Sequence, residues 1–282
     1  MTTDNSQTGA WRLVADGMVF PEGPTLLSSG ELLWTDADSG TLLISGGDAG
    51  KAVVATIPAR ILGTAALTQT RIVVACASPA GLAFVDLASG EQTGIDLRPH
   101  DIELVNDIAI GADGTVLFTD SGSDENDFRG GVWRLDGSEP FPVRVPLRYA
   151  NGILIDAANS RVLIAETSNR RILSIPYPVR AGQDVKPAVF ATMEGGVGPD
   201  GLAVDGAGNV YVAHYGTGLI HVYSSDGELI GDILAPGLNP TNLILNPTTG
   251  DLFLTEAESG AVWMLPGDGI LPHRMPTQPA HG

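Results

Sequence analysis

The stretch ELVNDIAIGADGTVLFTDSG, residues 103–122, has the pattern of a β-hairpin. An alternating apolar run follows Asn106 and Asp107, a turn follows at residues 112–114, and a second alternating run ends at Asp120. Alternation with a period of two indicates strands with one face on a core. Because the strands of a hairpin are antiparallel, the polar residues at both outer ends should meet on the same face of the molecule.

The same pattern recurs along the chain and determines the expected architecture. Successive copies are separated by 41 to 49 residues, and further copies begin at Glu22, Gly63, Asn151, Asp200 and Asn242. Third strands are expected from Gly131, Arg171, Leu219 and Ala261. A repeat of this length with about four short strands per unit is typical of a β-propeller. We therefore expect an all-β fold, a six-bladed β-propeller with a central divalent cation site, as one domain over residues 11–282 after a frayed tail at residues 1–10.

The composition limits the classes of partner. The 282 residues carry a net charge of −18, which argues against nucleic acid or an anionic membrane as a partner. The single cysteine, Cys76, excludes an intramolecular disulfide and a cysteine-based zinc site. The N-terminal sequence lacks the basic and apolar regions of a signal peptide, so the expected location is cytoplasmic.

The residue before each inner apolar run should lie at one mouth of the central channel. These ring positions are Glu22, Gly63, Asn106, Asn151, Asp200, and Asn242 or Thr241. Carboxylate and amide oxygens suit a hard cation, and calcium tolerates irregular coordination. Asn-Gly and Asp-Gly are also ordinary turn dipeptides, but the shared register favours a metal ring over separate turns.

The end of each second strand should return to the same mouth. The positions are Asp36, Ala77, Asp120, Glu166, His214 and Glu256. We interpret the four acids mainly as residues that cap their own turns, and we keep Asp120 and Glu166 as candidate pocket residues. His214 breaks the acidic pattern; it is either a pocket group or a structural histidine.

At these residues the chain resembles the senescence marker protein / gluconolactonase / luciferin-regenerating enzyme-like family. The matching pieces run in order from Trp11 to Leu265 and are FPEGPT, LVNDIAIGADG, YANGILID, GPDGLAVDGAGNVYVAHYG and PTNLIL. The resemblance implies a six-bladed propeller with a central divalent cation, often calcium, that hydrolyses lactones; relatives such as paraoxonases and diisopropyl fluorophosphatases act on lactones or organophosphates. It also implies that Glu22, Asn151 and Asp200 are metal ligands, and that Asn106 is a further ligand or a substrate contact.

One departure from that family concerns the substrate. Sugar lactonases of the family often have Arg two residues before the Asn of the Asn-Asp motif, whereas this chain has Leu104. We therefore expect a substrate less polar than a sugar lactone. AETSNRRILSIPY, residues 165–177, is also similar to strictosidine synthase-like propellers, which need no metal, but the four oxygen donors favour the metal-dependent branch.

The expected activity is metal-dependent opening of a lactone or related ester of a small-molecule substrate. The cation is most simply Ca²⁺, with Zn²⁺, Mg²⁺ or Mn²⁺ as alternatives. Asp200 is the candidate general base, Asn106 a second catalytic residue, and His214 could orient water or the leaving group. Asp107 should alternate away from Asn106, so it is the weaker candidate base.

Further pocket candidates surround this centre. They are Leu104, Asp120, Glu166 and Asn242, together with a loop at residues 121–131 that forms either a mobile wall of the pocket or a solvated acidic loop. Two other functions stay open: a non-hydrolytic synthase or isomerase, and a calcium-stabilised small-molecule binding protein.

Overall fold

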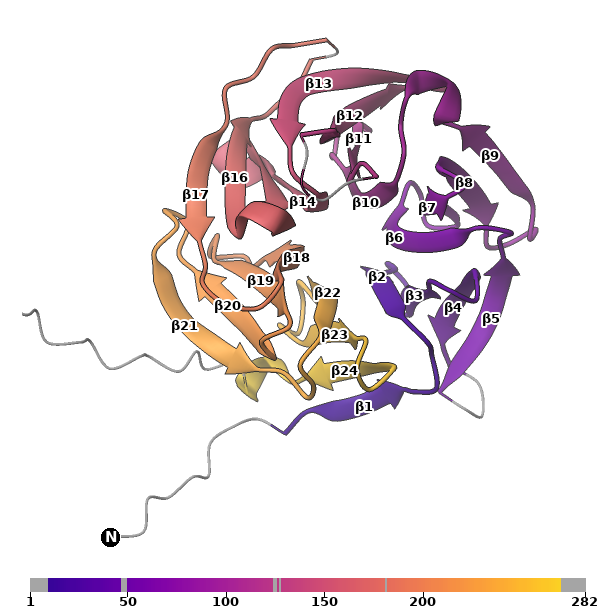
Figure 1. Ribbon diagram of the computed structural model, residues 1–282. Helices are drawn as coiled ribbons and strands as arrows, with labels where there is room; N and C mark the ends of the chain where they lie inside the picture. The colour runs from indigo at the N-terminus through magenta and orange to yellow at the C-terminus, as the bar shows by residue number, and fades with distance from the viewer. Residues whose placement is uncertain (1–9, 47–49, 124–125, 127, 181, 270–282) are drawn as a thin grey trace, which may run out of the picture.

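The computed structural model describes residues 10–46, 50–123, 126, 128–180 and 182–269. Within them, 24 strands form six four-stranded sheets arranged around a central axis (Figure 1). The predicted all-β, six-bladed propeller is therefore confirmed. Most of the predicted N-terminal tail, residues 1–9, lies outside the described residues. None of the helices in the described part of the chain has the length and hydropathy needed to span a lipid bilayer.

Blades 1 to 5 each use four strands that follow one another from the axis outward. In blades 1 to 3 they are β2 (Pro21–Leu26), β3 (Leu32–Asp36), β4 (Thr41–Ser45), β5 (Lys51–Thr56), β6 (Arg60–Ala66), β7 (Arg71–Ser78), β8 (Gly81–Asp86), β9 (Gln92–Asp96), β10 (Val105–Ile110), β11 (Val116–Asp120), β12 (Gly130–Asp136) and β13 (Glu139–Leu147). In blades 4 and 5 they are β14 (Ala150–Asp156), β15 (Arg161–Glu166), β16 (Arg171–Pro176), β17 (Ala188–Thr192), β18 (Gly198–Val204), β19 (Val210–Tyr215), β20 (Leu219–Tyr223) and β21 (Leu229–Leu234). Short 3₁₀ helices lie at η1 (Arg98–His100), η2 (Ala157–Asn159), η3 (Thr167–Asn169) and η4 (Gly267–Gly269).

The sixth blade joins the two ends of the described chain. Its strands are β22 (Pro240–Leu245), β23 (Leu252–Glu256), β24 (Ala261–Leu265) and, outermost, β1 (Arg12–Ala15). β1 pairs antiparallel with β24, with Leu13 opposite Trp263, and buried Ala15 packs in a cluster with Val262. The ring is thus closed by hydrogen bonds between segments far apart in the sequence.

The hairpin predicted from residues 103–122 is β10 and β11, with Ala109 opposite Leu117. Gly114 has φ +82° and its N–H donates to the carbonyl of Gly111 over 2.9 Å. This left-handed backbone favours glycine and explains the tight turn between two alternating runs.

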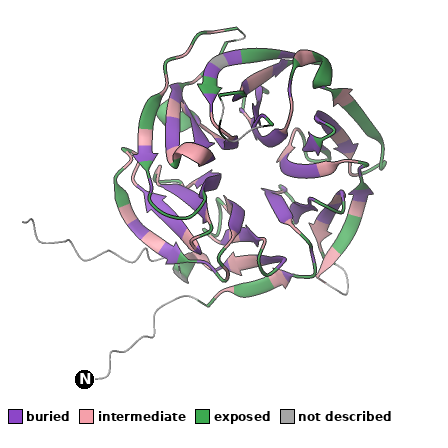
Figure 2. Ribbon diagram, viewed as in Figure 1, coloured by how far each residue is buried: buried purple, intermediate pink, exposed green. Residues whose placement is uncertain are grey.

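Burial decreases from the axis outward (Figure 2). The cores lie between neighbouring sheets, as where Leu117 and Val132 of blade 3 cluster with Ile153 and Ile164 of blade 4. Hydroxyl groups at the ends of second strands also donate to the next inner strand: Thr35 to the Leu62 carbonyl (2.9 Å), Thr119 to that of Asn151 (2.7 Å) and Ser121 to that of Ala150 (2.7 Å). These bonds fix the height of neighbouring inner strands at the mouth where the ring residues lie.

Candidate active site at the mouth of the central channel

Each of the six inner strands carries a bulge near its start, which affects the register of the ring. One residue at this end of each inner strand pairs with the end of the second strand, as Val105 does with Asp120 and Pro21 with Asp36. The next residue along each strand forms an upper tier: Glu22, Leu62, Asn106, Asn151, Asp200 and Thr241. The one after it forms a lower tier: Gly23, Gly63, Asp107, Gly152, Gly201 and Asn242.

This register corrects the predicted positions in blade 2 and decides between the two predicted alternatives in blade 6. Leu62, and not Gly63, is the blade 2 member of the upper tier, because Ile61 is the residue opposite Cys76. The second-strand position of blade 2 is accordingly Cys76 rather than Ala77. In blade 6 the upper tier holds Thr241, whose hydroxyl donates to the Pro21 carbonyl over 2.8 Å.

In the lower tier, polar side chains pack directly against the backbone of glycines on the neighbouring inner strand. A Cβ on Gly63 would lie 2.3 Å from Asp107 Oδ1, and one on Gly201 would lie 2.1 Å from Asn242 Oδ1. Only glycine leaves room for these polar side chains, which lie against the inner strand of the preceding blade. The bulge between Val105 and Ile108 interrupts the alternation on which the prediction that Asp107 points away from Asn106 depends.

Three carboxylates, those of Glu22, Asp107 and Asp200, are buried close enough to influence one another. Burial, followed by the charge of Asp107, raises the pKa of Glu22 to about 7. Burial raises the pKa of Asp107 to about 6, even though the N–H groups of Ile108 and Ile153 donate to its carboxylate. Burial and then the charges of Glu22 and Asp107 raise the pKa of Asp200 well above its ordinary value. A positive charge at this place would stabilise all three ionised forms.

Amide groups complete this cluster. Asn242 hydrogen-bonds Glu22 and Asp107, and Asn151 hydrogen-bonds Asp200; each contact lowers the carboxyl pKa. Asn106 donates its Nδ2 to Ser121 Oγ over 3.0 Å, so its side-chain oxygen is the atom left to bind a ligand.

The donors fit a hard cation. Among the residues that the structure describes, no group of three or more His, Cys, Asp and Glu side chains could hold a metal ion. A cation held by Glu22 and Asp200 would therefore draw its remaining protein ligands from the oxygens of Asn106 and Asn151. Mixed carboxylate and amide oxygens are typical of calcium, and less so of zinc, which favours nitrogen and sulfur.

A cavity of about 610 Å³ opens above Asn151 and Asp200. Its lining includes the rings of Phe20 and Tyr215, which stack with their centroids 6.5 Å apart, and several polar side chains. The lining residues are Phe20, Asn126, Tyr149, Asn151, Thr167, Ser168, Arg170, Gly196, Val197, Asp200 and Tyr215. Tyr149 and Arg170 have φ values of +53° and +48°, so two of its wall residues have uncommon backbone conformations.

Two of the predicted pocket residues lie next to this cavity or below it. Leu104 packs in an apolar cluster with Leu62 and Phe20, and Phe20 also lines the cavity. Asn242 lines a separate cavity of about 360 Å³ farther along the channel, which it shares with Asp107. The mouth thus has an apolar side on blades 1 to 3.

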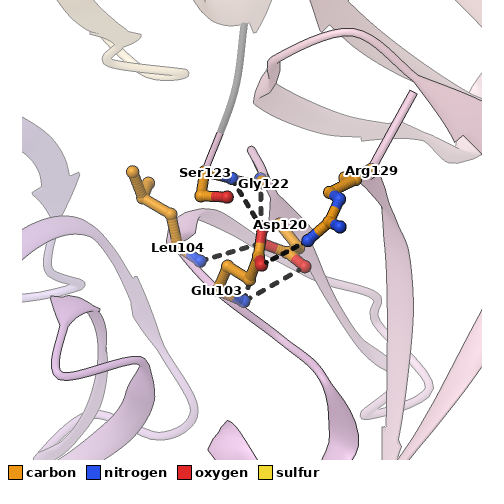
Figure 3. A network of polar contacts seen from close by, with 6 residues as sticks. All are labelled: Glu103, Leu104, Asp120, Gly122, Ser123 and Arg129. Carbon is orange, nitrogen blue, oxygen red and sulfur yellow. Dashed lines mark hydrogen bonds and ion pairs between the residues drawn. The ribbon is translucent and has the colours of Figure 1, made fainter. Parts of the chain in front are cut away.

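The Asp120 carboxylate accepts hydrogen bonds from backbone N–H groups (Figure 3). Its Oδ1 accepts from the N–H groups of Leu104 (2.9 Å) and Gly122 (3.0 Å). Asp36 and Glu256 make equivalent bonds to the loop before the inner strand and to their own turns. The turn interpretation is confirmed for these three acids.

Glu166, the other acid kept as a pocket candidate, differs from them. It accepts from the Arg148 N–H over 2.9 Å and pairs with the Arg171 side chain. It makes no side-chain cap to η3, so the prediction that it caps its own turn is wrong.

His214 is fully buried, and protein atoms occupy both ring nitrogens. Nδ1 lies 2.9 Å from His221 Nε2, and Nε2 lies 3.2 Å from the Gly195 carbonyl oxygen. Burial, and next the neighbouring His221, lower the pKa of His214 to about 4. His214 therefore lies behind the cavity wall, and this geometry does not favour the predicted direct contact with water or a leaving group.

The loop predicted as a pocket wall is described in part. Residues 124–125 and 127 lie outside the described residues, and Asn126 lines the cavity. The Ser123 N–H and the Arg129 guanidinium bind the Glu103 carboxylate over 2.7 and 2.9 Å (Figure 3). The loop is thus attached to the strand entry that also positions Leu104.

Comparisons with known proteins agree with this geometry. A family model described as SMP-30/Gluconolactonase/LRE-like region matches residues 20–258. Lactonase drp35 from Staphylococcus saprophyticus is 28% identical over 172 residues, which cover 59% of this chain and 53% of that protein. Diisopropyl-fluorophosphatase from Loligo vulgaris is 31% identical over 138 residues, which cover 48% of this chain and 42% of that protein. The chain spans about half the length of the curated relatives it matches.

Solved structures extend the similarity to nearly the whole chain. A gluconolactonase from Xanthomonas campestris superposes with a TM-score of 0.78 and 25% identity, covering 93% of this chain and 91% of that one. A calcium-binding protein, regucalcin, from Agrobacterium tumefaciens shares the fold with a TM-score of 0.79 and 22% identity, covering 91% and 93%. Since the family model matches the chain from the loop before β2 to the end of β23, the chain belongs to the SMP-30/gluconolactonase/LRE-like family.

Proposed function

We propose that this protein is a divalent-cation-dependent hydrolase that opens a lactone or a related ester. The observation that carries the proposal is the position of Asp200 and Asn151, which line the cavity while Asp200 also belongs to the buried carboxylate cluster. The lactonase and phosphatase names of the relatives support the same reaction class.

We assign the cation ligands to Glu22, Asn106, Asn151 and Asp200, and the cation to calcium. When bound, such a cation supplies Lewis-acid polarisation of the substrate carbonyl. The description of the regucalcin neighbour as a calcium-binding protein supports this choice, and so do the buried carboxylates of Glu22 and Asp200, whose pKa values burial raises.

Asp200 is the proposed general base. Water attacks the carbonyl carbon, Asp200 accepts the water proton, and the proton passes to the ring oxygen as the carbon–oxygen bond breaks, giving a hydroxy acid. Asn151 orients the Asp200 carboxylate through its hydrogen bond. Asn106, held by Ser121, is placed to direct its oxygen to the cation or the substrate.

The substrate is proposed to be less polar than a sugar lactone. Leu104 lies where sugar lactonases of this family often have an arginine, and the cluster that it forms with Leu62 and Phe20 continues into the cavity wall. An apolar wall does not bind the hydroxyl groups of a polyhydroxy ring, whereas an alkyl or aryl substituent would pack on it.

The test is a panel of alkyl, aryl and polyhydroxy lactones measured with calcium and after chelation. We expect turnover of alkyl or aryl lactones that chelator abolishes and calcium restores. Turnover that survives verified metal removal would exclude the metal-dependent mechanism. Calcium-dependent folding without turnover of any lactone or ester would instead indicate a binding protein.

A further inference from the structure

A hydrogen-bonded chain of three side chains crosses blade 5 behind the cavity. His214 on β19 contacts His221 on β20 at 2.9 Å, and His221 Nδ1 contacts Asp232 Oδ1 on β21 at 2.5 Å. His214 is 0% exposed and His221 9%, while the Asp232 side chain is 17% exposed. These three hydrogen-bonded side chains therefore run from the outer strand of the blade to the back of the cavity wall.

The direction of these hydrogen bonds is set by the carbonyl at the inner end. The Gly195 oxygen can only accept, so His214 Nε2 must carry the proton in their 3.2 Å contact. His214 Nδ1 is then an acceptor, and His221 Nε2 must donate to it. The third contact needs a further proton, on His221 Nδ1 or on Asp232 Oδ1. With that proton in place, one arrangement satisfies all three contacts.

The inner end of the chain holds a segment that lines the cavity. A Cβ on Gly196, whose φ is +52°, would lie 2.9 Å from His214 Nε2, so this glycine allows the segment to approach the imidazole. Gly196 and Val197 line the cavity, and Arg170 donates to the Gly196 carbonyl from the other side at 3.2 Å. The segment continues directly into β18, which carries Asp200.

Blade 5 differs from the blades with an acid at the same position. Asp36, Asp120, Glu166 and Glu256 accept backbone N–H groups there, whereas His214 donates to a carbonyl. A partner that donates to one ring nitrogen of a histidine favours the tautomer in which the other nitrogen carries the proton. His221 and Asp232 provide that partner.

We propose that His221 and Asp232 are positioning residues, which hold His214 in the tautomer that anchors the Gly195 carbonyl and thereby fix the Gly195–Val197 wall of the cavity. Neither residue lines the cavity of about 610 Å³. The kinetic readout of this proposal rests on the proposed function, whereas its structural readout does not.

The experiment compares His221→Gln with His221→Leu in the full chain loaded with calcium. Glutamine can donate an N–H to His214 Nδ1, and leucine fills space without donating. We expect His221→Leu to raise KM about fivefold or more with kcat within about twofold, as a wall displaced from the bound substrate would. His221→Gln should recover most of the wild-type KM. Asp226→Asn, on the exposed turn of the same blade, is the matched control and should change nothing.

The structural readout is amide hydrogen exchange at Gly195–Val197, measured by NMR. Faster exchange in His221→Leu, but not in His221→Gln or Asp226→Asn, supports the proposal even if no lactone is turned over. Equal behaviour of the leucine and glutamine variants, in KM or in exchange, would overturn it because packing alone would then explain the site. If His221→Leu does not fold, Asp232→Ala is the alternative variant, because it removes the hydrogen-bond partner of His221 Nδ1. Unchanged amide exchange at Gly195–Val197 in that variant would overturn the proposal.

Discussion

At the scale of single residues, Asn106 and Asp107 are adjacent in the sequence but occupy different tiers of the ring. Asn106 belongs to the upper tier and can offer its oxygen at the mouth, whereas Asp107 lies one tier lower against Gly63. The bulge in β10 lies at these two residues. The charge of Asp107 also contributes to the raised pKa of Glu22 and Asp200, so Asp107 influences the site without lining the mouth.

Replacing Asp200 by Asn should lower kcat by about 100-fold or more, because the amide cannot accept the proton of the attacking water. Stopped assays on the best lactone of the panel, with calcium in excess, measure the loss. Asp226→Asn serves as the control, and the melting temperature checks that both variants are folded. A variant Asp200→Asn that kept its rate within about twofold would show that another group is the base.

Cys76 should be unreactive in the folded protein. It occupies the position that holds an acid in four other blades, and burial raises the pKa of its thiol to about 11. At pH 8 we expect a colorimetric disulfide reagent to label it about 100-fold more slowly than in urea, since only the thiolate reacts. Equal labelling rates in buffer and in urea would contradict the burial of this thiol.

At the scale of elements, the four blades with an acid at the end of the second strand use that side chain to hold the backbone that enters the first strand. In blade 6 that side chain is Glu256, which accepts from the N–H groups of Asn239 and Ser259 over 2.9 and 2.7 Å. The close approach of Gly237 leaves no room for rearrangement around this carboxylate. The acid therefore fixes both the entry to β22 and the turn after β23.

Replacing Glu256 by Leu should reduce the free energy of unfolding by about 1–3 kcal/mol, because buried N–H donors lose their acceptor. Glu256→Gln keeps one acceptor oxygen and should cost less. Urea unfolding followed by tryptophan fluorescence gives both values, with exposed Glu228→Gln as the control. A leucine variant as stable as the control would show that these N–H groups find other partners.

At the scale of the whole molecule, pairing between segments far apart in the sequence closes the propeller ring. Blade 6 takes three strands from one end of the described chain and β1 from the other. The indole of Trp11 adds a 2.8 Å hydrogen bond to the Leu234 carbonyl in blade 5. We call the pairing of β1 with β24 the seam. Separation of these two strands would expose the hydrophobic clusters on both sides of blade 6.

A charge at the seam tests this closure. Ala15 is 3% exposed and Leu13 is 50% exposed on the same strand. Ala15→Glu should lower the free energy of unfolding by about 3 kcal/mol or more, since it buries an unpaired carboxylate, and Leu13→Glu should change it by about 0.5 kcal/mol or less. Urea unfolding measures both. Similar values for the two variants would show that β1 is not needed for closure.

Removal of the cation is also a test at this scale, because the proposed ligands come from four of the six blades. We expect chelation to lower the melting temperature and calcium to raise it again, with a dependence on calcium concentration that reports binding to the folded state. Scanning calorimetry with magnesium as the comparison ion measures it. An unchanged melting temperature in calcium would argue against a cation shared among Glu22, Asn106, Asn151 and Asp200.

The inner hairpins and most third strands could be predicted because alternation and turn residues are local signals. The observed β12, β16, β20 and β24 begin within one residue of the predicted positions. Exposed outer strands such as β9 have no apolar alternation to reveal them. The pairing of β1 with β24 is a contact between distant segments, which periodicity does not report.

Site residues could be predicted where the register of the repeat is unambiguous. Residues whose positions depend on a loop or a bulge could not be predicted. The structure brings Glu22, Asn151 and Asp200 to the channel, but in blade 2 the predicted register was wrong by one residue because of the bulge. Tyr149 and Arg170 reach the cavity from loops with left-handed backbones, which no repeat marks. His214 and His221, seven residues apart in one expected hairpin, were a sequence signal that could have indicated the hydrogen bond between them in blade 5.

The seam in blade 6 also has a consequence for the order of events during synthesis. Among the described strands the ribosome produces β1 before all others and β24 after all others, so β1 emerges long before the strand with which it pairs. Throughout that interval its backbone edge has no partner, and an open edge can pair with another chain. Nascent chains should therefore be most prone to association just before the last hairpin is released, and a chaperone that covers β1 would protect them at that moment.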